Sequence, residues 1–246
     1  MIRHLILSVV VLTLSCAAIA GGNEKITSFT QAKKLLKGIY ADHRETFYCK
    51  ASFLKDNSVI LPEGFSTPKH GKRAKRIEWE HIVPAENFGR TFIEWREGHP
   101  DCIDKDGDTF KGRKCAEKTN EAFRLMQADM YNLVPAIGAV NALRSNYNYT
   151  ELSAETPYTF GSCPMKIDGK KVQPPAYTKG AIARTYFYME SAYPRFRISQ
   201  TMKKMMMIWD NQYPVTPWEC ERTKRIEKIQ KNINHIVSDK CIKAGL

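Results

Sequence analysis

Residues 76–85 (RIEWEHIVPA) combine acidic side chains and a histidine with an apolar, β-branched run that predicts a strand over 77–83. Charged groups are rare in buried strands, so Glu80 and His81 suggest a chemical role. An imidazole with a pKa near neutrality can take a proton from water, which makes His81 a candidate general base. Glu80 offers a carboxylate oxygen, a preferred ligand of Mg²⁺. A satisfied polar network is the alternative interpretation on spacing alone.

A second candidate ligand lies further along the chain. Apolar residues at spacings of three and four predict a helix over residues 116–133, which Pro135 would end. Asn132 falls at the end of this helix, and its amide oxygen could join Glu80 on one Mg²⁺. Asn132 could equally serve as a helix cap. Because adjacent residues on a regular strand point to opposite faces, the strand would have to end near His81 for both residues to share a site.

This combination fits the hydrolysis of a phosphodiester bond. The reaction needs an in-line nucleophile, a base that deprotonates it, and positive charge near the phosphate oxygens of the transition state. His81 would supply the base, Glu80 and Asn132 would hold the metal ion, and an arginine would hold the phosphate.

The remaining pattern predicts an α+β chain in which helices dominate and strands are few. Further helices are expected at residues 27–50, 178–193, 199–212 and 218–237. An Asp-rich stretch at residues 104–108 lacks the acid and glycine positions of an EF-hand loop, so we expect a polar hairpin turn there.

The first 20 residues have the form of a secretory signal peptide. Arg3 precedes an apolar run that is too short to span a bilayer and that ends at small residues. Lipoprotein attachment at Cys16 is the alternative, but Thr13 stands where that signal usually has Leu. We therefore expect a mature body of residues 21–246 that forms one domain, is periplasmic or secreted, and has no membrane span.

The cysteines favour disulfides. Leaving Cys16 aside, an even number remains, as is typical of exported chains. The pairs least demanding in loop closure are Cys102 with Cys115 and Cys220 with Cys241. Zinc binding is the rival interpretation, but the sequence contains no CxxC spacing.

The chain is strongly basic, with 38 Lys and Arg against 26 Asp and Glu and a formal net charge of +12. Such a balance favours polyanionic partners, which include nucleic acid, anionic membrane surfaces and acidic polysaccharide. Cations are dense at residues 69–76 and 222–231. Both groups would ordinarily be solvated faces, and in an enzyme acting on nucleic acid they become candidate phosphate contacts.

Several long segments closely resemble the bacterial periplasmic and secreted endonuclease I family, in the order in which the family has them. They are RIEWEHIVPAENFGR (76–90), KGRKC (111–115), ADMYNLVPAIGAVNALRSN (128–146), KVQPP (171–175), GAIARTYFYM (180–189) and WECERTKRI (218–226). The resemblance covers nearly all of the chain after residue 20. It implies a sequence-nonspecific nuclease with a helix-rich α+β fold built around a ββα-metal (His-Me finger) core.

The resemblance also implies the roles of individual residues. It makes His81 the general base that activates water, and Glu80 and Asn132 the ligands of Mg²⁺, for which Mn²⁺ or another divalent cation can substitute. Arg113, in the KGRKC segment, resembles the arginine that holds the scissile or product phosphate. The ββα unit would consist of the strand ending at His81, a second strand before Asn132, and the helix that bears Asn132.

The implied substrates are double- and single-stranded DNA and also RNA, contacted through the phosphate backbone by a monomer. A basic periplasmic protein that binds nucleic acid without cutting it is the alternative function. Within the hydrolases, a zinc-dependent phosphoesterase is a further alternative, although zinc normally takes several His or Cys ligands.

Overall fold

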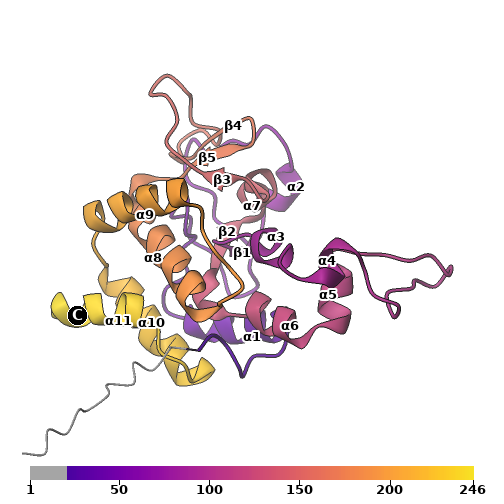
Figure 1. The fold of residues 1–246 in the computed structure, drawn as a ribbon. Helices are drawn as coiled ribbons and strands as arrows, with labels where there is room; N and C mark the ends of the chain where they lie inside the picture. Colours follow the sequence, from indigo (N-terminus) through magenta and orange to yellow (C-terminus); the bar gives the residue numbers. More distant parts are fainter. Residues whose placement is uncertain (1–20) are drawn as a thin grey trace, which may run out of the picture.

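At the centre of the molecule lies a two-stranded antiparallel sheet (Figure 1). The structure is a computed structural model that describes residues 21–246, so the predicted signal peptide lies outside the described residues. Strand β1 (Ile77–His81) pairs with β2 (Leu133–Ile137), and His81 stands opposite Leu133. Every residue of β2 is buried, as are most of β1. Strand β1 thus forms within the predicted segment, and His81 ends it.

The proline that was expected to end a helix lies in the middle of β2. Ile82 N donates a hydrogen bond to Asn132 O (3.0 Å), so these two residues form a hydrogen-bonded pair directly beyond the pair of His81 and Leu133. Hydrogen-bonded and non-hydrogen-bonded pairs alternate along an antiparallel ladder, so Trp79 and Pro135 form a non-hydrogen-bonded pair. Proline has no N–H to donate, and at this register none is needed.

Helix α7 (Gly138–Arg144) follows β2 directly and contacts both strands. Strands β1 and β2 with α7 therefore form a β–β–α arrangement, but the expected placement of its parts was wrong. The second strand and the helix both come after Asn132, whereas we expected a strand before it and a helix that carries it.

The single helix predicted over residues 116–133 is also wrong, because side-chain caps divide it. The structure has α5 (Arg113–Thr119), α6 (Glu121–Gln127) and a 3₁₀ turn, η1 (Met130–Asn132). Asn120 has an extended backbone and caps α6, with Oδ1 accepting a hydrogen bond from Phe123 N (3.0 Å). Asp129 caps η1 by accepting from Tyr131 N (3.0 Å). Caps of this kind satisfy the first amides of a helix and so favour a new start at each one.

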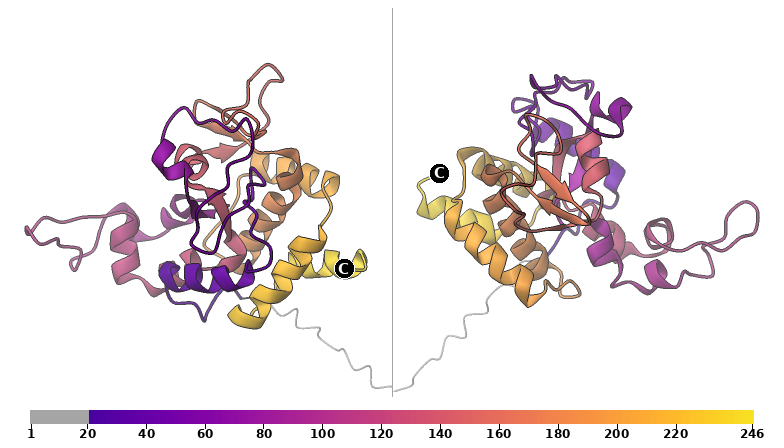
Figure 2. Two further views of the ribbon diagram at one scale, coloured as in Figure 1. Left: turned by 180° about the vertical axis from the view of Figure 1, so that it is seen from behind. Right: turned by 90° about the horizontal axis from the view of Figure 1, so that it is seen from above.

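Four helices gather on one side of the central sheet, as Figures 1 and 2 show. They are α8 (Ala176–Ala192), α9 (Gln200–Gln212), α10 (Pro217–Gln230) and α11 (His235–Lys243). The predictions for α8 and α9 are confirmed to within two residues at each end. The helix predicted over 218–237 is instead two helices, because Lys231 is left-handed (φ 65°) and Asn234 caps α11.

The N-terminal helix α1 (Phe29–Ile39) is shorter than the predicted 27–50. Ser28 caps it, with Oγ accepting from Gln31 N (3.1 Å). Before the helix, Asn23 fastens the chain to the body. Its Nδ2 donates to Leu125 O (2.9 Å) and its N donates to Tyr193 Oη (2.8 Å).

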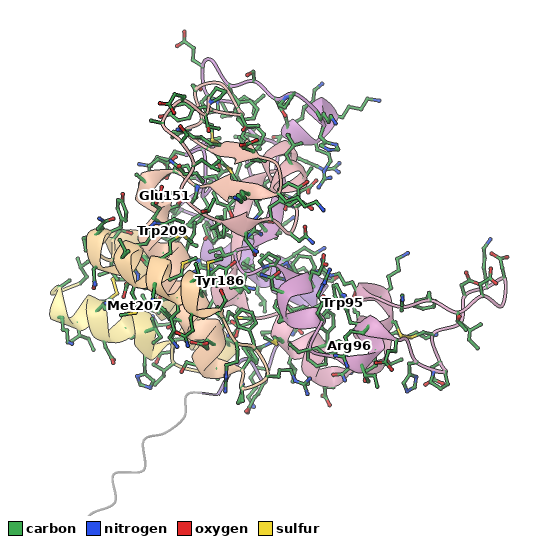
Figure 3. The ribbon with its side chains drawn as sticks, turned by 45° about the horizontal axis from the view of Figure 1, so that its top comes forward. Trp95, Arg96, Glu151, Tyr186, Met207 and Trp209 are labelled. Carbon is green, nitrogen blue, oxygen red and sulfur yellow. A yellow bond between two sulfur atoms is a disulfide. The ribbon has the colours of Figure 1, made fainter. Side chains whose placement is uncertain are left out.

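An arm of residues 97–112 projects from the opposite side to α8–α11 (Figures 1 and 2). Figure 3 shows Trp95 and Arg96 on α4 (Ile93–Arg96), where the arm leaves the body. Gly112 N donates to Trp95 O (3.0 Å), which closes the base of the arm. The polar turn predicted at residues 104–108 is confirmed, since Asp104 Oδ1 accepts from the amides of Asp106 and Asp108.

The other elements are short. They are α2 (Gly71–Ala74), α3 (Ala85–Gly89), and a three-stranded sheet in the order β3 (Asn148–Tyr149), β5 (Lys171–Gln173), β4 (Lys166–Asp168).

Residues 21–246 contain three disulfides. The two predicted pairs, Cys102–Cys115 and Cys220–Cys241, are confirmed, and the third joins Cys49 to Cys163. The helix-rich α+β class with disulfides is therefore as predicted. Across residues 21–246, no helix combines the length and apolar character needed to span a bilayer.

Candidate functional site

A polar hollow of about 530 Å³ lies between α1, β1 and α7. His81 and Arg113 both line it, so the structure brings these two predicted site residues together. Phe29 and lysines of α1 form one wall, and Asn141 of α7 belongs to another. We call this hollow the cleft. A second hollow of about 230 Å³, on the side of Tyr177 and Trp218, contains none of the predicted site residues.

His81 is held at one ring nitrogen. Its Nε2 lies 2.8 Å from the carbonyl oxygen of Gln127. A carbonyl can only accept a hydrogen bond, so Nε2 carries the proton and Nδ1 of the neutral ring keeps its lone pair. Burial, with the nearby Arg113 guanidinium, lowers the pKa of His81 to about 3. The imidazole is therefore neutral at neutral pH, and Nδ1 is the atom that can accept a proton.

An aromatic ring from α1 contacts both of these residues. The Phe29 ring centroid lies 4.9 Å from that of His81, and the Arg113 guanidinium lies 5.2 Å from the same ring. Because Ser28 caps α1 just before Phe29, the start of the helix fixes the position of the ring.

Arg113 is the first residue of α5, after Gly112 with φ 83°. Its Nε donates to Gln127 Oε1 (3.1 Å), while its Nη2 is buried and has no hydrogen-bond partner among residues 21–246. The disulfide of Cys115 holds the same short helix to the base of the arm. The guanidinium is thus fixed beside His81 with donor capacity to spare.

Glu80 does not line the cleft itself but lies behind it against α7. It is 4 % exposed, and its Oε1 accepts from Arg144 Nη1 (2.8 Å). Arg144 also donates to the carbonyl oxygens of His81 (2.8 Å) and Ile82 (2.6 Å). Burial raises the pKa of Glu80, and the Arg144 charge opposes that rise. Arg144, to which the sequence assigned no role, therefore fixes both the carboxylate and the backbone that ends β1.

Asn132 is not brought into the cleft. It is fully buried, its Oδ1 accepts from Val83 N (2.7 Å), and its Nδ2 donates to Val83 O (3.0 Å). Both ends of the amide are used to fasten the chain after β1 to η1. A ligand role would require these buried hydrogen bonds to break, so the geometry does not favour the predicted pairing of Asn132 with Glu80 on one ion.

A different asparagine occupies the cleft. Asn141 lies on α7 three residues before Arg144, and its Nδ2 donates to Glu78 Oε2 (2.9 Å). Its Oδ1 accepts no hydrogen bond from the described residues. In the sequence, Asn141 belongs to the segment that follows Pro135. If Pro135 had been placed inside a strand, this segment would have been recognised as the end of that strand followed by a helix.

The cations near the cleft are also partly different from those expected. Lys33, Lys34 and Lys37 of α1 line it together with Arg76, which belongs to the predicted basic run. Of the α10 cations expected to contact phosphate, Lys224, Lys228 and Lys231 are exposed, whereas the two arginines are occupied by other groups of the protein. Arg222 is buried and donates to the carbonyl oxygens of Met130 and Leu133, and Arg225 pairs with Asp42 and Glu221.

The oxygen donors near His81 suit a hydrated, hard cation better than zinc. Within residues 21–246, no cluster of three or more His, Cys, Asp or Glu side chains could hold a metal ion. In the described part of the chain, Asn141 Oδ1 accepts no hydrogen bond, and Glu80 accepts a side-chain hydrogen bond only at Oε1. Mg²⁺ keeps several waters and needs few protein ligands, so a carboxylate and an amide oxygen fit it.

Known proteins resemble the chain along most of its length. The family model for Endonuclease I matches residues 27–241. An extracellular deoxyribonuclease of Aeromonas hydrophila is 40 % identical over 221 residues, which are 87 % of this chain and 90 % of the relative. A periplasmic deoxyribonuclease of the same organism is 38 % identical over 225 residues (89 % and 88 % of the two chains).

An Endonuclease-1 of Buchnera aphidicola subsp. Acyrthosiphon pisum (strain APS) is 40 % identical over 225 residues, which are 89 % of this chain and 83 % of the relative. The match to the family model includes β1, β2 and α7. The chain belongs to the endonuclease I family.

Proposed function

We propose that the protein is an exported endonuclease that hydrolyses phosphodiester bonds of DNA with the help of a divalent cation. The observation that carries the proposal is that one cleft holds His81, whose Nδ1 makes no hydrogen bond with residues 21–246, beside Arg113 and the lysines of α1. The relatives named deoxyribonucleases support DNA as the substrate.

In the proposed mechanism His81 Nδ1 takes a proton from a water molecule. The hydroxide oxygen bonds to phosphorus as the P–O bond to the leaving oxygen breaks, and the leaving oxygen takes a proton from solvent. Arg113 donates to a non-bridging phosphate oxygen and so offsets the charge of the transition state. The Nε2 hydrogen bond to the Gln127 carbonyl favours the imidazolium that forms and holds the ring in position.

Glu80 and Asn141 are the residues that would hold the cation, with Mg²⁺ the expected ion and Mn²⁺ a substitute. Bound there, the cation would supply positive charge to the phosphate. Arg144 keeps the Glu80 carboxylate in position, and Glu78 orients the Asn141 amide. This assignment keeps the predicted role of Glu80 and transfers the amide role from Asn132 to Asn141.

Lys33, Lys34, Lys37 and Arg76 would contact the phosphate backbone along the cleft. Contacts of this kind carry no sequence information and weaken as salt rises. Double- and single-stranded DNA, and RNA, are all chemically compatible with such contacts, and a monomer suffices to make them. Export to the periplasm or the medium agrees with the three disulfides, which persist in oxidising compartments.

Plasmid cleavage by the purified protein, with and without chelator, tests the proposal against a protein that only binds nucleic acid. The His81→Ala variant should bind DNA about as well as wild type and lose cleavage by on the order of 10²-fold or more, because the base is gone. Readdition of Mg²⁺ or Mn²⁺ to chelated wild type should restore cleavage. Binding without cleavage by wild type would favour the non-catalytic alternative, and rescue by zinc alone would favour a zinc phosphoesterase.

A further inference from the structure

Gln127, the last residue of α6, touches both functional side chains of the cleft. It is fully buried. Its backbone oxygen accepts the hydrogen bond from His81 Nε2 (2.8 Å), and its side-chain Oε1 accepts the one from Arg113 Nε (3.1 Å). One residue thus positions the proposed base through its main chain and the proposed phosphate ligand through its side chain.

Arg113 is half-buried, and its charge balance differs from that of two of the buried arginines, Arg144 and Arg184. Arg144 pairs with Glu80 (2.8 Å), and Arg184 pairs with Asp210 and Glu219 (3.0 and 2.7 Å). Arg113 forms no ion pair with an acidic residue in the described chain, and its side-chain partner is the neutral amide of Gln127. Its positive charge is therefore held in place without being neutralised.

Two donors at this junction have no acceptor. Arg113 Nη2 and Gln127 Nε2 are both buried and make no hydrogen bond with any residue of 21–246. The amide of Gln127 cannot be turned to improve this, because its oxygen must face the Arg113 N–H. Buried donors without partners are unfavourable unless a ligand provides an acceptor. A phosphate group offers several acceptor oxygens and the negative charge that Arg113 lacks.

We propose that Gln127 is a positioning residue that orients Arg113 without neutralising it, and that its neutral amide sets the affinity of the cleft for the substrate and product phosphate. The inference rests on the proposed function, since the phosphate belongs to the nucleic acid that the cleft would hold. Three properties of Gln127 carry it: complete burial, the hydrogen bond to Arg113 Nε, and the unmatched donor at Nε2.

Two substitutions separate orientation from charge, and neither removes the backbone oxygen that holds His81. Gln127→Glu keeps an acceptor for Arg113 Nε but adds a neutralising charge. Gln127→Met has a similar length and removes the acceptor without adding charge. Gln173→Glu is the matched control for the added charge, because Gln173 Oε1 also accepts a hydrogen bond (from Leu152 N, 2.7 Å) and lies outside the cleft.

The measurements are the dissociation constant for inorganic phosphate, from ³¹P NMR titration of the metal-free protein, and kcat and KM for plasmid cleavage. We expect Gln127→Glu to weaken phosphate binding and raise KM by about tenfold while kcat stays within about threefold, the pattern of a lost uniform binding interaction. Gln127→Met should lower kcat by about tenfold and change the phosphate dissociation constant by less than threefold. Gln173→Glu should leave all three within about twofold.

In this pattern one Gln127 variant changes phosphate binding and the other changes kcat. A general loss of structure would not produce it. If both Gln127 variants change phosphate binding and kcat in the same proportion, or if Gln127→Glu binds phosphate as wild type does, the inference is wrong. Should Gln127→Glu fail to fold, Gln127→Met decides, since unchanged kcat in that variant overturns the orienting role. The NMR titration needs no catalysis, so a wild type that binds phosphate but cuts no DNA would count against the proposed function and not against the role of Gln127.

Discussion

Two buried polar clusters lie close together in the sequence, and they differ in how completely their hydrogen bonds are matched. Around Asp129, the carboxylate accepts from Tyr188 Oη (2.7 Å), Tyr193 Oη (2.6 Å), Gln230 Nε2 (2.9 Å) and Tyr131 N (3.0 Å). Two residues earlier, the cluster around Gln127 and Arg113 has two buried donors with no partner among residues 21–246.

The difference separates a structural network from a binding site. A buried network that is fully matched stabilises the fold, because each donor replaces the water that folding removed. Buried donors that have no partner do not stabilise the fold until a ligand provides an acceptor for them. The same short segment of chain therefore carries one cluster with matched hydrogen bonds and one that we propose binds phosphate.

The largest expected contrast comes from one substitution in each cluster. Arg113→Met should reduce DNA cleavage by about 10²-fold or more, through loss of transition-state charge stabilisation, without lowering the free energy of unfolding. Asp129→Asn should lower the free energy of unfolding by about 3 kcal/mol, because an amide nitrogen cannot accept from the tyrosine hydroxyls. Urea denaturation and plasmid cleavage measure the two effects. A loss of stability in Arg113→Met as large as that in Asp129→Asn would remove the distinction.

A smaller contrast is expected between the two asparagines. Asn141→Ala should lower cleavage by roughly 10- to 100-fold at fixed Mg²⁺, with partial recovery at higher Mg²⁺, as for a weakened metal site. Asn132→Ala should instead lower the free energy of unfolding by about 1–3 kcal/mol, because it leaves the buried N–H and C=O of Val83 without partners. Metal titrations of cleavage, beside denaturation curves, distinguish the two. A metal-dependent defect in Asn132→Ala alone would reverse our assignment.

The smallest expected effect, taken over a single pH unit, is the pH dependence of stability that His81 confers on the metal-free protein. Its pKa falls from 6.5 to about 3 on folding, so between these values the unfolded chain binds a proton that the folded protein does not. The contribution of the neutral His81 ring to the free energy of unfolding is therefore complete above pH 6.5 and is lost as the pH falls towards 3. The difference in unfolding free energy between wild type and His81→Gln should fall on acidification by at most about 1.4 kcal/mol per pH unit. A difference that is constant between pH 4 and 7 would contradict the burial of a neutral ring.

Local signals in the sequence predicted much of the fold. The β-branched run around Trp79 predicted β1, helical periodicity predicted α8 and α9, and loop length predicted Cys102–Cys115 and Cys220–Cys241. The third disulfide, Cys49–Cys163, spans 114 residues, and nothing local points to so distant a pairing.

The site was harder to predict because it depends on how β1 and β2 are paired. It also depends on which polar side chains already have hydrogen-bond or ion-pair partners within the protein. Pro135 resembles a helix end, and only its place in a non-hydrogen-bonded pair of the ladder allows a strand there. That error placed the expected amide at Asn132, which does not line the cleft, and overlooked Asn141, which does. The two arginines of α10 were misjudged for a related reason, since Arg222 and Arg225 have partners in distant segments, Met130 and Asp42, that the sequence alone does not place beside them. For His81 and Arg113 the structure provides proximity, and their chemical roles stay predictions.

The start of the described chain has a consequence for processing. Helix α1 carries the aromatic wall and three of the lysines of the cleft, and Asn23 ties the segment before it to Leu125 and Tyr193. A protease that trimmed the chain past Asn23 would leave every proposed catalytic group in place yet release the tether of α1. The point at which the predicted signal peptide is cleaved would therefore set how firmly the cleft keeps its shape.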